Sequence, residues 1–135
     1  MSALPFTLLV LIAYNIAVFG FGDTALVTTV ASIKLPSMAG TEAAWIISIA
    51  DLLVLGGLVA LFIEIAKATR TGNVSIADHG ASFLVFVGFL LEFLLVIQAG
   101  NTTFFILMCI AGIDVLAGFT VSITGARRDW GGHHG

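Results

Sequence analysis

The feature that most constrains this chain is a set of long apolar stretches that carry almost no charge. Charged residues make up only 10% of its 135 residues and sit mostly in short clusters. The stretches between the clusters are roughly 20 residues long, enough for a helix to cross a bilayer core about 30 Å thick. A soluble domain has about 25% charged residues. The sequence therefore argues against a soluble enzyme and predicts an all-α integral membrane protein.

Four such stretches predict a bundle of four transmembrane helices within a single domain, residues 1–135. The approximate spans are 4–21, 43–67, 76–99 and 102–125. Ser75 and Asp78 have the spacing of a capping box, in which each side chain satisfies a free backbone donor at the start of the third helix. The N-terminal stretch lacks the basic residues of a signal peptide, so we interpret it as an uncleaved first span.

The longest connection, residues 23–43, joins the first two spans and is expected to form an outer loop of about 20 residues. Its apolar residues Leu26, Val27, Val30 and Ile33 follow a helical spacing, which favours a short amphipathic helix lying in the membrane interface. Its many β-branched residues leave an extended, hairpin-like conformation as the alternative.

The few cations of the chain predict its orientation. The side that holds the loop after the second span and the C-terminal tail carries Lys67, Arg70, Arg127 and Arg128. The other side carries Lys34 alone. Loops rich in Lys and Arg remain in the cytoplasm. We therefore expect both termini in the cytoplasm (N-in/C-in) and place the chain in the inner, cytoplasmic membrane of a bacterium.

Aromatic and basic residues at the ends of spans are typical interfacial anchors. Trp45 lies near the start of the second expected span, and Arg127, Arg128 and Trp130 follow the fourth. The tail residues are also suited to attract anionic lipids. These positions agree with a lipid bilayer as the first partner of the chain.

One polar residue in each expected span could carry chemistry: Asn15, Asp51, Glu92 and Asp114. Asp51 and Glu92 are expected about 10 Å below the outer surface and Asp114 near the midplane. No Lys, Arg or His lies at that depth. Intramembrane polar groups are costly and tend to be paired or functional. They could line a path for protons or cations, fix helix packing through hydrogen bonds, or pair with cations of a partner protein.

Small residues recur at helical spacing in three of the spans. They are Gly57 and Ala60 in the second span, Gly88 in the third, and Gly118 and Ser122 in the fourth. Such residues let helices approach closely. Glu64 shares a face with Gly57 and Ala60, roughly opposite to Asp51. We therefore expect the second span to contact two neighbours, one of which could be another subunit.

The sequence contains no pattern that predicts an enzyme, a metal site or a bound cofactor. No nucleophile–base pair is visible among Cys109, the serines and the histidines. His79 is expected at the interface, where pigment ligation would rest on it alone, and His133 and His134 lie in the tail. The formal net charge of -3 offers no basic surface for nucleic acid.

Taken together, these patterns predict a small membrane subunit that is not an enzyme. We expect it to assemble through close helix contacts into a homo-oligomer or a larger membrane complex. The alternative is a proton or cation transporter or channel that uses the intramembrane carboxylates. The sequence names neither the complex nor the ion.

Overall fold

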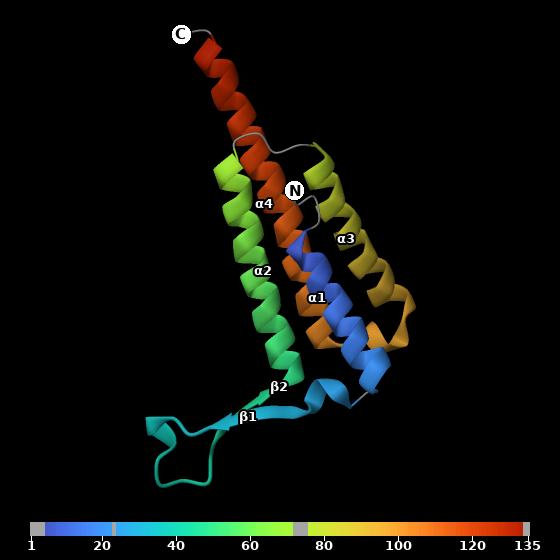
Figure 1. Ribbon diagram of the computed structural model, residues 1–135, viewed down its shortest axis with the longest axis vertical. Coiled ribbons are helices and arrows are strands. Elements are labelled where there is room, and N and C mark those ends of the chain that lie inside the picture. Colours follow the sequence, from blue (N-terminus) through green and yellow to red (C-terminus); the bar gives the residue numbers. More distant parts are fainter. Residues whose placement is uncertain (1–4, 23, 72–75, 134–135) are drawn as a thin grey trace.

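The computed structural model describes residues 5–22, 24–71 and 76–133, and the side chains of 5–22, 24–67 and 80–120. Within these ranges the chain is mostly helical. Four helices run alternately down and up, with a β-hairpin at the lower end and the C-terminus at the upper end (Figure 1). The helices are α1 (Phe6–Asn15), α2 (Ile49–Thr71), α3 (Ile76–Leu95) and α4 (Thr102–His133).

The order of the helices follows the expected spans, but their bounds differ. The first span corresponds to α1 and a π-helical continuation, η1 (Ile16–Gly20). The second was expected from residue 43, whereas α2 begins at Ile49 because the preceding residues form a strand. The fourth was expected to end at residue 125, whereas α4 continues to His133.

The connection between α1 and α2 is a β-hairpin, so the interfacial helix expected for residues 23–43 is wrong and the extended alternative is present. Strand β1 (Thr29–Ile33) pairs antiparallel with β2 (Trp45–Ser48). The β-branched residues of both strands favour an extended backbone over the helix that the apolar spacing suggested. Gly40, with a φ of 79°, lies in the loop between the strands, where a side chain would be strained.

Most of the largest fully buried side chains lie in the half of the bundle nearest the hairpin, between α1, α3 and α4. Tyr14, Phe89, Phe104 and Leu107 are among the largest fully buried side chains. The Phe104 ring meets the Tyr14 ring edge-on, with 4.8 Å between the centroids, and lies 5.3 Å from the Phe89 ring. Edge-on aromatic pairs of this kind add about 0.5–1.5 kcal/mol to the effect of burial.

Two of the glycines expected at helix contacts lie against a neighbouring helix of the same chain. A Cβ atom on Gly57 of α2 would lie 3.0 Å from the Ile110 Cδ1 atom and 3.2 Å from the Leu107 Cδ2 atom of α4. A Cβ atom on Gly88 of α3 would lie 3.8 Å from the Leu11 Cδ2 atom of α1. Gly57 therefore allows a close contact between two helices of one chain, whereas the contact at Gly88 has room for a Cβ atom.

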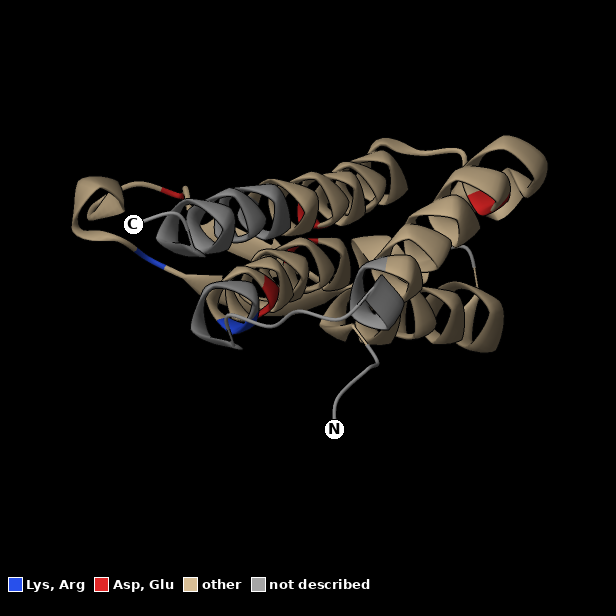
Figure 2. Ribbon diagram, turned by 90° about the horizontal axis from the view of Figure 1, so that it is seen from above, with Lys and Arg blue, Asp and Glu red and all other residues tan. Residues whose placement is uncertain are grey.

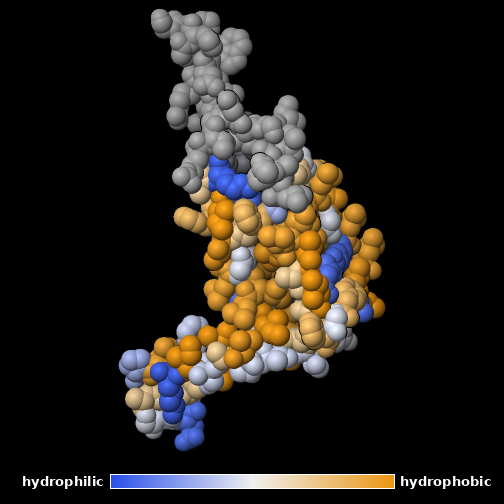
Figure 3. Space-filling view, in the orientation of Figure 1, coloured by the Kyte–Doolittle hydropathy of each residue, from blue (hydrophilic) through white to orange (hydrophobic). Residues whose placement is uncertain are grey.

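The outer surface of the helices is strongly apolar. Large side chains such as Phe62 (72% exposed), Leu95 (77%) and Leu116 (67%) point away from the bundle. In the space-filling view, apolar residues cover most of the described part of the helices, and polar residues gather on the projecting hairpin (Figure 3). A monomeric soluble protein rarely exposes so large an apolar surface.

Two helical segments among the described residues are long and apolar enough to cross a membrane, by length and composition. They are Ile49–Lys67 in α2 and Thr102–Thr120 in α4. Their mean hydropathies are 2.3 and 2.0. The apolar segments Phe6–Gly20 and Gly80–Leu95 are shorter.

Candidate functional site: two polar clusters inside the helix bundle

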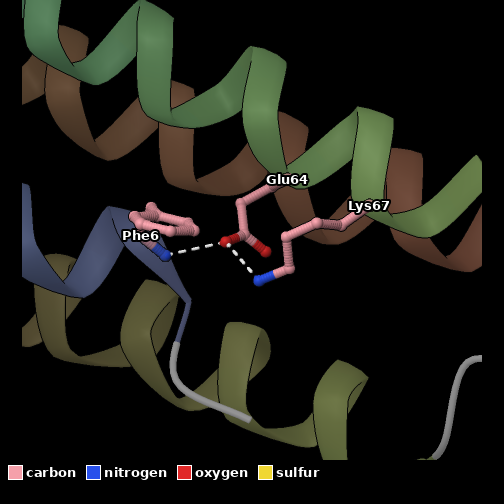
Figure 4. Close-up of polar contacts among 3 residues, drawn as sticks. All are labelled: Phe6, Glu64 and Lys67. Atoms are coloured by element: carbon pink, nitrogen blue, oxygen red, sulfur yellow. Dashed lines mark hydrogen bonds and ion pairs between the residues drawn. The ribbon is translucent and has the colours of Figure 1, made fainter. Parts of the chain in front are cut away.

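The first polar cluster, which we call the upper cluster, lies between the helices on the side away from the hairpin. Its centre is Glu64 of α2, whose Oε1 atom accepts hydrogen bonds from the Phe6 backbone N–H (2.8 Å) and from Lys67 Nζ (3.3 Å; Figure 4). The Lys67 ammonium lies 4.9 Å from the centroid of the Phe6 ring. Glu64 thus satisfies a free N–H of the first turn of α1, where the helix dipole favours a negative charge.

Asp114 of α4 is the second carboxylate of the upper cluster. The Thr7 hydroxyl of α1 and the Ser82 hydroxyl of α3 lie beside its carboxyl group, and Glu64 and Lys67 are close enough to act on it electrostatically. Asp114 is 6% exposed and Thr7 is 2% exposed. The Asp114 Oδ2 atom and the Thr7 Oγ1 atom have no hydrogen-bond partner. The upper cluster therefore joins all four helices and leaves two buried oxygen atoms unsatisfied.

The second polar cluster, the lower cluster, lies near the hairpin end. The Tyr14 hydroxyl of α1 donates a hydrogen bond to the Gln98 carbonyl oxygen (2.6 Å) and accepts one from Asn101 Nδ2 (2.7 Å). Asn101 Oδ1 in turn accepts a hydrogen bond from the Phe104 backbone N–H (2.9 Å), which caps the start of α4. The cluster thus fixes α1 against the connection between α3 and α4.

Asn15 and Glu92 extend the lower cluster across α1 and α3. Asn15 Nδ2 donates hydrogen bonds to Glu92 Oε1 (3.1 Å) and to the Leu11 carbonyl oxygen (3.0 Å). The Glu92 Oε2 atom is buried and has no hydrogen-bond partner. The structure therefore brings together two of the four polar residues that the sequence singled out.

Asp51 lies apart from both clusters, at the exposed start of α2. Its Oδ2 atom accepts hydrogen bonds from the Ser48 backbone N–H (2.9 Å) and the Ser48 hydroxyl (3.1 Å), and the Ser48 Oγ atom accepts one from the Asp51 backbone N–H (3.3 Å). This reciprocal pattern caps the helix. Asp51 was expected well inside a span because the helix was expected to begin at residue 43.

An apolar layer separates the two clusters. Thr7 and Asn15 are eight residues apart on one helix, which corresponds to about 12 Å along its axis. Phe89, Leu107 and Ala111 are fully buried or nearly so at the intervening level of the bundle. The two clusters do not form one continuous polar passage in this conformation.

The other sequence-predicted residues fall into two groups. Gly57, Ala60 and Gly88 lie within the described bundle, with Ala60 buried, and Gly118 is half-buried on α4. Trp45 lies on strand β2 and its side chain is exposed. The side chains of the remaining residues lie outside those that the structure describes: Ser122, Arg127, Arg128, Trp130 and His79.

Sequence reasoning did not select several residues that complete the clusters. They are Thr7, Tyr14, Ser82, Gln98 and Asn101. Hydroxyl and amide groups are common in apolar helices, so their presence alone did not mark them. One usable signal was the adjacent pair of Tyr14 and Asn15, because two neighbouring polar residues in an apolar helix face partly different neighbours.

Described acidic residues lie on several of the helices, and the hairpin carries both an acidic and a basic residue (Figure 2). Among the described residues, no group of three or more His, Cys, Asp and Glu side chains is arranged to hold a metal ion. The upper cluster instead offers two carboxylates, two hydroxyl groups and one ammonium group. This donor set suits hydrogen bonds and single positive charges.

Comparisons with known proteins add no assignment to this geometry. No protein-family model matches the chain, and no curated protein or solved structure is significantly similar to it.

Proposed function

We propose that the chain is a small integral membrane subunit with a structural role in a homo-oligomer or a larger membrane complex. In this proposal all four helices cross the cytoplasmic membrane of a bacterium, and both termini lie in the cytoplasm. The observation that carries the proposal is the apolar outer surface of a bundle that holds two polar clusters between its helices.

The distribution of exposed side chains supports a lipid environment. In a soluble protein the exposed Phe62, Leu95 and Leu116 would each leave an apolar side chain in water, at a cost of about 1.5–3 kcal/mol relative to burial. Lipid tails remove that cost. Backbone polar groups within the helices are satisfied internally, as a bilayer requires.

The arrangement of the helices supports the proposed orientation. The C-terminal ends of α2 and α4 lie at the end of the bundle opposite to the hairpin (Figure 1). Lys67 and Arg70 belong to the end of α2, and Arg127 and Arg128 belong to that of α4. Lys34 lies on the hairpin side. Four cations against one favour a cytoplasmic position for the upper end.

The pairing of the interior polar groups supports a structural role. Glu64, Asn15 and Tyr14 each join segments that are distant in sequence, and an apolar layer lies between the two clusters. Interhelical hydrogen bonds and close glycine contacts stabilise membrane bundles. A rigid bundle with an apolar outer surface is suited to pack laterally against other membrane helices.

Cysteine labelling in intact cells tests the orientation. In a Cys109→Ser background, Ser37→Cys places a thiol in the exposed loop of the hairpin, and Thr71→Cys places one at the end of α2. A membrane-impermeant maleimide should label the first variant in spheroplasts and the second only after permeabilisation. Equal labelling of both thiols before permeabilisation would contradict the proposed topology.

Native sizing tests the assembly. Extraction into lipid nanodiscs or native membrane particles, followed by native mass spectrometry, should yield particles that contain more than one protein chain. The control is extraction in a harsh detergent, which should reduce the particles to single chains. Particles that hold one chain at every protein-to-lipid ratio would rule out the subunit role while leaving the topology intact.

Cation movement is a second candidate function, favoured by the unsatisfied Asp114 Oδ2 and Thr7 Oγ1 atoms of the upper cluster. Proteoliposomes with a pH or sodium gradient provide the test. Flux that is lost in Asp114→Asn and retained in Asp51→Asn would support transport. Absence of flux in the wild-type protein would exclude it.

A further inference from the structure

Asp114 brings a negative charge into the bundle for which the described residues provide no dedicated counterion. Among the residues whose side chains the structure describes, the ionisable groups that act on it are Glu64 and Lys67, both on α2. Lys67 forms an ion pair with Glu64 at 3.3 Å. With both carboxyl groups ionised, the described side chains of the upper cluster carry two negative charges and one positive charge. A net buried charge of this kind is costly unless it is neutralised.

The hydrogen-bonding capacity of the site is also unfilled. An ionised carboxylate can only accept hydrogen bonds, whereas a hydroxyl group can both donate and accept. The Thr7 and Ser82 hydroxyl groups lie near enough to act on the Asp114 carboxyl group from α1 and α3, but Asp114 Oδ2 and Thr7 Oγ1 form no hydrogen bond. Both atoms belong to side chains that are more than nine-tenths buried.

We propose that Asp114, together with the hydroxyl groups of Thr7 and Ser82, binds one hard monovalent cation, either a proton or a sodium ion. A proton on Asp114 would let the acid donate a hydrogen bond to a neighbouring hydroxyl group. A sodium ion would be held by the same oxygen atoms, which are the hard ligands that such a cation prefers. Either cation balances the charge of the upper cluster.

This proposal rests on the membrane placement proposed above, because the cost of the unbalanced charge is greatest where lipid surrounds the bundle. It does not require transport or assembly. Its test uses purified protein in nanodiscs and reads out the bound charge, so that a failure here leaves the topology and sizing experiments unaffected.

Infrared spectroscopy tests whether the cation bound at Asp114 is a proton. Protein labelled with ¹³C at aspartate should show a neutral carboxylic-acid band at pH 7 that is absent from Asp114→Asn and present in Asp51→Asn. Thr7→Val should shift this band to higher frequency, because the acid loses a hydrogen-bond partner. Thr7→Val keeps the shape of the side chain and leaves Asp114 in place, so it remains informative if Asp114→Asn fails to fold.

Thermal unfolding in sodium chloride and in choline chloride at equal ionic strength tests whether the bound cation is a sodium ion. Sodium should raise the melting temperature of the wild-type protein and of Asp51→Asn, with a smaller rise in Thr7→Val and none in Asp114→Asn. A neutral-acid band or a sodium-dependent rise, lost with Asp114, supports the proposal. An ionised Asp114 together with no sodium effect would overturn it, as would signals that persist in Asp114→Asn.

Discussion

Tyr14 shows how a single side chain can hold several segments of this chain together. It is fully buried, its ring packs against Phe104, and its hydroxyl group joins Gln98 and Asn101. Tyr14→Phe keeps the ring but leaves the two partners without the hydroxyl. We expect the free energy of unfolding to fall by about 1–3 kcal/mol, measured by titration with a denaturing detergent.

A matched control removes a hydroxyl group that serves no long-range contact. The exposed Thr120 donates a hydrogen bond to the Leu116 carbonyl oxygen of its own helix (2.8 Å). Thr120→Val should change stability by less than about 0.5 kcal/mol. If both variants lose the same stability, the buried hydrogen bonds of Tyr14 do not have the role assigned to them.

Asn15 and Glu92 provide a second prediction, because their hydrogen bond is a direct side-chain contact between α1 and α3. A double-mutant cycle with Asn15→Ala and Glu92→Ala should give a coupling energy of about 0.6 kcal/mol, the average for such contacts in membranes. Thermal or detergent unfolding of the four proteins measures it. Asp51→Ala combined with Asn15→Ala serves as the control pair, and coupling of similar size there would contradict the assigned contact.

At the scale of the helix, two adjacent glycines of α2 allow a direct test of close packing. A Cβ atom on Gly57 would press on Ile110 and Leu107 of α4, whereas a Cβ atom on Gly56 would meet nothing within 4 Å. Gly57→Ala should lower the free energy of unfolding by about 1 kcal/mol, since overpacking outweighs the gain in helix propensity. Gly56→Ala should raise it by up to about 1 kcal/mol.

Both variants replace glycine by alanine in the same helix. The gain in helix propensity is therefore common to both and cancels when they are compared. The measurement is the difference between their unfolding free energies in the same lipid. A difference near zero would show that α2 and α4 approach each other less closely than the structure has them.

The hairpin carries a prediction about depth. Strand β2 leads directly into α2, so Trp45 should lie at the membrane surface if α2 spans the bilayer. In a Trp130→Phe background Trp45 is the only tryptophan. Its fluorescence should be quenched by lipids brominated close to the headgroup and much less by lipids brominated near the end of the tail. Quenching by neither lipid would show that the hairpin lies in water.

The elements differ in how far the sequence could predict them. Long apolar runs predict the four helices in their order because each run has one physical solution in lipid. The hairpin was only the alternative, because Leu26, Val27, Val30 and Ile33 fit a helical spacing in a segment too short for periodicity to decide. The Ser48 and Asp51 capping pattern was visible in the sequence and marks the true start of α2.

For the whole molecule, the sequence could predict that polar side chains meet inside the bundle. It could not predict that they form two separate clusters. Depth along each helix follows from residue number, whereas rotation about the helix axis depends on packing. Glu64, expected on the face of its helix opposite to Asp51, approaches Asp114 because α1 and α4 both pack against α2. The same packing separates Asp114 from Glu92 by an apolar layer.

Whether the outer surface of the bundle faces lipid can be tested at one native residue. Cys109 is the only cysteine of the sequence, and its side chain is exposed on α4. A spin label on Cys109 in nanodiscs should collide more often with oxygen, which dissolves in lipid, than with a water-soluble nickel complex. In a Cys109→Ser background, a label on Ser37→Cys in the hairpin loop should show the opposite preference.

The same label also reports on assembly, because each chain carries one thiol. Low accessibility to both reagents, together with dipolar broadening between labels, would place Cys109 in a contact between two copies within the membrane. Preferential collision with the nickel complex at Cys109 would mean that water reaches the middle of the candidate span Thr102–Thr120. That result would contradict a lipid-facing outer surface, and with it the membrane placement on which the subunit role depends.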